Sequence, residues 1–114
     1  MKLVLNSHRV RLEENELLSM LQAFPYKDWD WNWMSYSLSL TLGILLAFPY
    51  KEWCWGEGGI SRNPALTVDI LLAFPGKKWD WGAISSNPSL TLAMLLAFPG
   101  KNWDWSGMSL NPSL

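Results

Sequence analysis

The 114-residue sequence has little charge and a single cysteine. Charged residues make up 17% of the chain, and nine basic residues against ten acidic ones leave a formal net charge of −1. A chain with so small a net charge does not attract phosphate groups from a distance, so nucleic acid is a disfavoured partner. Cys54 has no second thiol for an internal disulfide, which favours a reducing compartment.

Long apolar runs and metal-ligand patterns are also missing. The longest apolar run, residues 44–49, is far shorter than the roughly 20 residues that a membrane span needs. Residues 1–6 contain too short an apolar stretch for a signal peptide, and His8 has no partner at metal-ligand spacing. Serines recur in register without a recurring His or Asp to activate them. These are Ser35, Ser61, Ser85 and Ser109. We therefore expect no membrane, no metal, no cofactor and no enzymatic activity.

What the sequence does contain is an internal repeat. The tripeptide Ala-Phe-Pro recurs with its Phe at 24, 48, 74 and 98, and a Trp-x-Trp pair follows each copy in the same register. The pairs are Trp29 and Trp31, Trp53 and Trp55, Trp79 and Trp81, and Trp103 and Trp105. Because self-similarity at a fixed period indicates a repeat architecture, we divide the chain as one repeat domain, 1–114. It comprises a degenerate N-terminal cap at 1–23, repeats around 24–47, 48–73 and 74–97, and a truncated repeat at 98–114.

Each repeat predicts two short helices. The hydroxyl of Thr67 can cap a first helix of about eight residues, which Pro75 ends. The carboxylate of Asp80 can cap a second helix over residues 81–86, which Asn-Pro at 87–88 ends. Helices of about two turns need neighbours to be stable in water. The pattern thus predicts an all-α fold, a short helical-repeat solenoid of about four 24-residue helix-turn-helix units.

A leucine-rich-repeat-like β/α solenoid is the alternative. Residues 35–42 alternate polar and apolar side chains as a half-buried strand does, and a 24-residue unit lies within the leucine-rich range. However, residues 65–72 lose this alternation after Asp69, which favours the helical interpretation.

Lysines and tryptophans are the candidate interaction residues. They are Lys27, Lys51, Lys77, Lys101, Trp29, Trp53, Trp79 and Trp103. In one interpretation each Lys neutralises the end of the preceding helix and pairs with the Asp three residues later. The Trp pairs then pack in the core, with positions of the Trp81 type inside and positions of the Trp79 type partly exposed. In the other, a ladder of Lys beside exposed Trp binds single-stranded nucleic acid or a glycan.

The two ends of the chain differ. Glu13, Glu14 and Glu16 make the N-terminal segment a polar cap, whereas residues 111–114 open a further unit without its helix. We expect an exposed apolar face at the C-terminal end, and any self-association to be a symmetric homodimer through it. Cys54 takes the Asp position of the second copy, where we expect an inert thiol.

Two motifs carry a resemblance to a known family. They are Asn-Pro-x-Leu-Thr at 63–67 and 87–91, and Pro-x-Lys-x-Trp-Asp-Trp at 75–81 and 99–105. With Ile-Ser at 84–85, they resemble the tandem Asn-Pro-x-Ile-Thr and Pro-x-Lys-Pro-Trp-x-Trp repeat proteins that giant DNA viruses of amoebae encode in many copies. The similarity runs from about residue 22 to the C-terminus. The chain departs from the family in Ala-Phe-Pro and in Cys54. The resemblance implies an α-helical repeat in the host cytoplasm, with no assigned chemistry.

We expect the chain to be a non-enzymatic scaffold for protein–protein interaction, with an unknown protein partner. Nucleic-acid or glycan binding is one alternative, and a fragment of a longer repeat array without independent activity is another. The first two can be told apart by which Trp of each pair is exposed, together with the charge around it.

Overall fold

The computed structural model describes residues 16–114, and these residues fold into short helices with no strand among them. The elements are α2 (Glu16–Ala23), α3 (Trp31–Met34), α4 (Leu42–Ala47), the 3₁₀ helix η1 (Ile60–Arg62), α5 (Val68–Ala73), α6 (Trp81–Ser85), α7 (Leu92–Ala97) and α8 (Trp105–Ser109). The all-α prediction is confirmed, and the leucine-rich β/α alternative is wrong for this part of the chain. Most of the predicted N-terminal cap, with His8, Glu13 and Glu14, lies outside the described residues.

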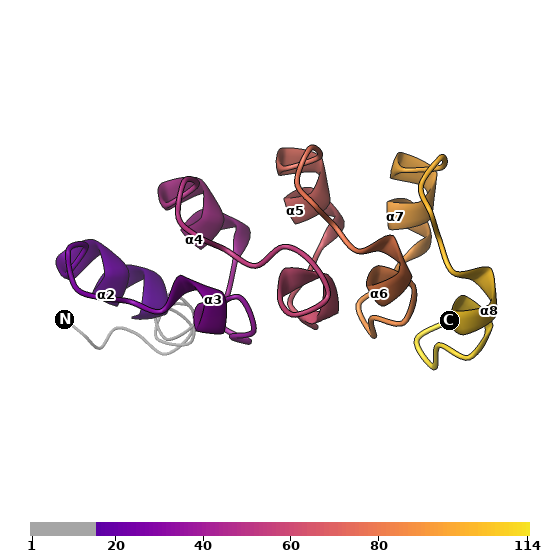
Figure 1. Ribbon diagram of the computed structural model, residues 1–114, viewed down its shortest axis with the longest axis horizontal. Coiled ribbons are helices and arrows are strands. Elements are labelled where there is room, and N and C mark those ends of the chain that lie inside the picture. Colours follow the sequence, from indigo (N-terminus) through magenta and orange to yellow (C-terminus); the bar gives the residue numbers. More distant parts are fainter. Residues whose placement is uncertain (1–15) are drawn as a thin grey trace, which may run out of the picture.

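The helices form two rows along the long axis of the molecule. Figure 1 shows α4, α5 and α7 in an upper row and α3, α6 and α8 below them, with the chain passing between the rows in each copy. The principal extents are 49 × 31 × 20 Å. Elements one copy apart are the ones that touch: α5 contacts α7, and α6 contacts both η1 and α8.

The upper helices begin and end where the sequence predicts. The Thr67 side chain accepts a hydrogen bond from the backbone N–H of Ile70, and the threonines that precede α4 and α7 do the same. At the other end Phe74 leaves the helical conformation, with φ −130° and ψ 58°, because Pro75 disfavours the α region for the residue before it. These helices have six residues, shorter than the expected eight.

The lower helices are capped by aspartates. Asp80 accepts from the backbone N–H of Ala83, and α3 and α8 have the same cap from Asp30 and Asp104. The second copy has Cys54 at this position and forms η1 instead of an α-helix. Its Ile60 N–H bonds to the Cys54 carbonyl, and a Cβ at Gly59 would overlap Cys54. Because Gly59 lacks a Cβ, the chain can turn back closely on Cys54.

The core lies between the two rows and receives aliphatic side chains from both. Its buried aliphatic and Met members from α2 to α7 are Leu21, Leu40, Ile44, Leu45, Ile60, Leu66, Ile70, Leu71, Ile84, Leu90 and Met94. The strand-like alternation at residues 35–42 lies in the turns that follow α3 and in the first residue of α4. There Leu40 is buried while Leu38 is 75% exposed, so the alternation does not mark the two faces of a strand.

Candidate functional site

A buried asparagine joins each unit to the one before it. The Asn87 Nδ2 donates to the carbonyls of Ser61 and Asn63 at 2.9 and 3.0 Å, and its Oδ1 accepts from the Ser89 N–H at 2.8 Å. Asn63 and Asn111 repeat this arrangement at the neighbouring junctions. From the sequence we expected these asparagines only to end helices. Because they recur at the same position of successive copies, the sequence did contain an indication that they also join the units.

A buried serine makes the second polar contact of the junction. The Ser85 hydroxyl donates to the Trp81 carbonyl at 2.8 Å and accepts from the Asp104 N–H of the next unit at 2.9 Å. Ser35 and Ser61 do the same toward Cys54 and Asp80. The recurring serines therefore bond at helix ends and also link one unit to the next.

The first tryptophan is the buried one in the second, third and fourth pairs. Trp53, Trp79 and Trp103 are only 6 to 7% exposed, so the prediction that these positions are partly exposed is wrong. The reason is a hydrogen bond over the proline turn: the Trp79 Nε1 donates to the Phe74 carbonyl at 2.8 Å, which satisfies both the indole and the end of α5. Trp53 and Trp103 make the same bond. Trp29 makes it too, but is only half-buried.

The second tryptophan lies between two units. The Trp81 ring is 5.2 Å from the ring of Phe98 and 5.1 Å, edge-on, from that of Trp103, measured between centroids. The rings of Trp31 and Trp55 each contact the equivalent Phe and Trp rings of the unit that follows. Tilted and edge-on pairs at this distance are favourable beyond the area that they bury. These rings are half-buried rather than inside the core, contrary to the prediction for positions of the Trp81 type.

The lysines complete the same junction. The Nζ atoms of Lys51, Lys77 and Lys101 lie 5.3, 5.3 and 5.5 Å from the ring centroids of Trp31, Trp55 and Trp81 in the preceding unit. This is cation–π geometry.

The predicted ion pairs of Lys27, Lys77 and Lys101 with the aspartates three residues later do not form within residues 16–114. The carboxylates of Asp30, Asp80 and Asp104 cap the lower helices instead. Each contact between successive units thus has the same parts. The second Trp of one unit packs against the Phe, Lys and first Trp of the next unit, and the buried Asn and Ser hydrogen-bond the two units. We call this set of contacts a junction.

The candidate interaction residues are thus mostly used between units. The ring faces of Trp53, Trp79 and Trp103 are covered, so they offer no stacking platform for a base or a sugar. Lys27 and Trp29 hold the same positions in the first copy.

Part of the exposed apolar surface lies on the upper helices. Leu46, Leu72 and Leu96 occupy the same position in α4, α5 and α7 and are 56, 54 and 71% exposed. The alanines that follow them are exposed as well. We call these three leucines the leucine row. The leucine row could not be predicted from the sequence, because a six-residue, nearly all-apolar helix has too few polar residues to indicate which side faces solvent.

Residues 16–114 contain no group of three His, Cys, Asp or Glu side chains that could hold a metal, and none of their helices is long and apolar enough to cross a membrane. Cys54 is a half-buried free thiol. Comparisons of the chain with protein-family models, with curated proteins and with solved structures find no match. Its function is therefore inferred from its own side chains.

Proposed function

We propose that the chain is a non-enzymatic helical-repeat scaffold that binds a protein partner through the leucine row. The observation that carries this proposal is the recurrence of an exposed leucine at one position of three successive upper helices. Contiguous exposed apolar side chains mark interaction sites on soluble proteins. A partner with a complementary apolar surface would bury all three leucines at once, at roughly 1.5 to 3 kcal/mol for each fully buried side chain.

The proposal includes a solenoid of about four units. Support comes from the junction contacts, which join positions 24 to 28 residues apart along the chain in the same way at successive copies. In such an array each unit is stabilised by its neighbours, and the repeated surface is the binding surface. Several residues of the motifs shared with the giant-virus repeat family have structural roles here: Thr67 and Asp80 cap helices, Asn87 bonds the preceding unit, and Lys77 and Trp79 contact Trp55. Membership in that family, and with it a place in the host cytoplasm, is part of the proposal.

A triple substitution tests the leucine row. With tagged full-length chain as bait in cell extract, Leu46→Gln, Leu72→Gln and Leu96→Gln combined should weaken capture of the partner about 100-fold, because the apolar contact area is lost. Leu38→Gln is the matched control, since Leu38 is 75% exposed but lies outside the row. Equal capture by the triple variant, or equal loss in the control, would contradict a binding site at the row. Unchanged thermal unfolding would show that the variants keep their fold.

A further inference from the structure

The two ends of the stack carry the two halves of one junction. Inside the stack, Trp81 of one unit lies beside Phe98, Lys101 and Trp103 of the next. The same set forms around Trp31 and around Trp55. Three equivalent junctions therefore show which chemistry covers the second tryptophan of a unit: a Phe ring, a Trp edge and a Lys ammonium.

The C-terminal end presents the first half. Trp105 is 63% exposed, and with Met108, Ser109, Asn111 and Leu114 it lines a cavity of about 390 Å³. The Ser109 hydroxyl donates to the Trp105 carbonyl, as Ser85 does to Trp81, and keeps lone pairs for a backbone N–H. By register, the Ser109 and Asn111 carbonyls match those of Ser85 and Asn87, which accept from Asn111 Nδ2 at the last internal junction.

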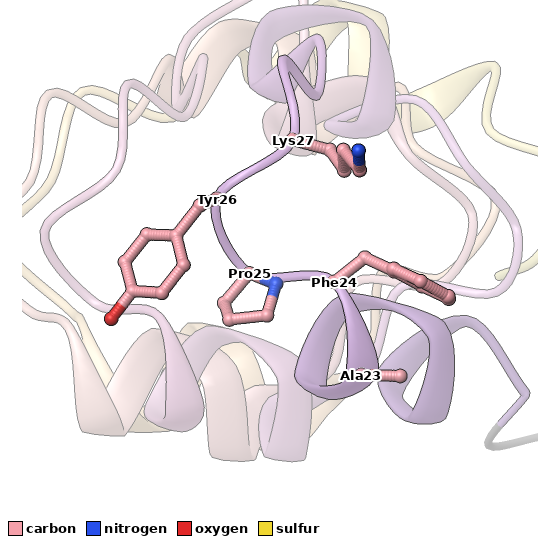
Figure 2. Close-up of a pocket in the computed structure, with 5 residues that line it drawn as sticks. All are labelled: Ala23, Phe24, Pro25, Tyr26 and Lys27. Atoms are coloured by element: carbon pink, nitrogen blue, oxygen red, sulfur yellow. The ribbon is translucent and has the colours of Figure 1, made fainter.

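The N-terminal end presents the other half. Figure 2 shows Phe24 and Lys27 projecting toward the same side, while Tyr26 points away from them. These residues, with Ala23 and Pro25, line a cavity of about 230 Å³. Phe24 is 54% exposed, whereas its three counterparts in the later copies are half-buried against a tryptophan. The space between the Phe24 ring and the Lys27 chain corresponds to the place that Trp31 occupies beside Phe48 and Lys51.

We propose that the occupant of the C-terminal end is the N-terminal end of a second copy of this chain. Trp105 of one copy lies between Phe24 and Lys27 of the other, and the Asp30 N–H donates to the Ser109 hydroxyl. This contact is head-to-tail, so it does not close on itself and adds copies in a row. The symmetric contact expected from the sequence would instead place carbonyl acceptors of one copy against those of the other.

Ser37 makes this contact weaker than an internal junction. It stands where the later copies have Asn, and its hydroxyl accepts from the Ser39 N–H as the Asn87 Oδ1 accepts from Ser89. Serine has no counterpart of the Nδ2 group that bonds two carbonyls of the preceding unit. Contacts between copies are therefore reversible, while the units within a copy stay joined.

Mixing two variants tests the head-to-tail contact by sedimentation of the full chain. Wild type should form oligomers that grow with concentration. Trp105→Ala alone and Phe24→Ala alone should be monomeric, because each lacks one half of the contact. Their mixture should give a 1:1 pair that grows no further, since each variant keeps the half that the other lacks. Tyr50→Ala should behave as wild type, because Tyr50 is 95% exposed and Gly76 and Gly100 stand at its position.

Ser37→Asn supplies the missing donor and should tighten self-association roughly tenfold or more through two added hydrogen bonds. Monomers at every concentration in both wild type and Ser37→Asn would overturn the proposal. So would a dimer that survives Phe24→Ala and disappears in Trp105→Ala, which is the behaviour of a symmetric C-terminal contact. The leucine row is intact in all of these variants, so their outcome is independent of partner capture.

Discussion

Trp79→Ala is expected to lower the free energy of unfolding by about 3 to 5 kcal/mol, as large aromatic truncations in a core do. Trp79 is 7% exposed, packs edge-on to Trp55 at 5.2 Å and donates from its indole to the Phe74 carbonyl. The substitution leaves a cavity at the junction and removes the partner of a carbonyl at the end of α5. Urea denaturation of the full chain measures the change.

Trp33→Ala is the matched control for this prediction. The Trp33 side chain is 75% exposed, and its removal should cost less than about 1 kcal/mol. The comparison therefore separates burial from residue type. Equal losses for the two variants would mean that the first tryptophan of each pair does not anchor the junction.

Asn87→Ala is expected to destabilise the chain by roughly 3 kcal/mol. The side chain is 2% exposed and makes three hydrogen bonds, two of them to the preceding unit. Removing it takes away both donors and leaves buried backbone groups short of partners, each at a cost of about 1 to 3 kcal/mol where water cannot replace the lost bond.

The matched control is Asn102→Ala, since Asn102 is exposed on the surface of the last unit. It should change the free energy of unfolding by less than about 0.5 kcal/mol. Hydrogen exchange adds a second measurement, because Asn87→Ala should speed exchange of the Asp80 N–H as its contact with the Ser61 hydroxyl loosens. If Asn87→Ala proves as mild as the control, the asparagine only shapes the turn within its own unit.

The sequence was sufficient to predict the local parts of the fold. The Thr67 and Asp80 caps and the stop at Pro75 depend on residues within one helical turn of each other, so a single copy contains the whole signal. The recurrence of the motif then predicted the same caps before α4, α7 and α8. The 3₁₀ helix η1 of the second copy was not predicted.

The contacts between units could not be predicted from the sequence in the same way. Whether Trp79 or Trp81 is buried depends on which ring reaches the Phe74 carbonyl and which faces the next unit. Both rings look alike in a Trp-x-Trp motif. Predicting the hydrogen bonds from the Asn87 Nδ2 would have required knowing which carbonyls of the preceding unit face it. These carbonyls belong to residues 24 and 26 positions earlier in the sequence. The leucine row likewise depends on how the upper helices are packed.

Exchange of the indole N–H protons, followed for each tryptophan by ¹H–¹⁵N NMR, decides whether the first tryptophan of each pair anchors the junction. Trp53, Trp79 and Trp103 should exchange slowly, because their indoles are buried and bonded to the carbonyls of Phe48, Phe74 and Phe98. The indoles of Trp55, Trp81 and Trp105 should exchange quickly. Slow exchange at Trp55 and Trp81 together with fast exchange at Trp53 and Trp79 would contradict this packing.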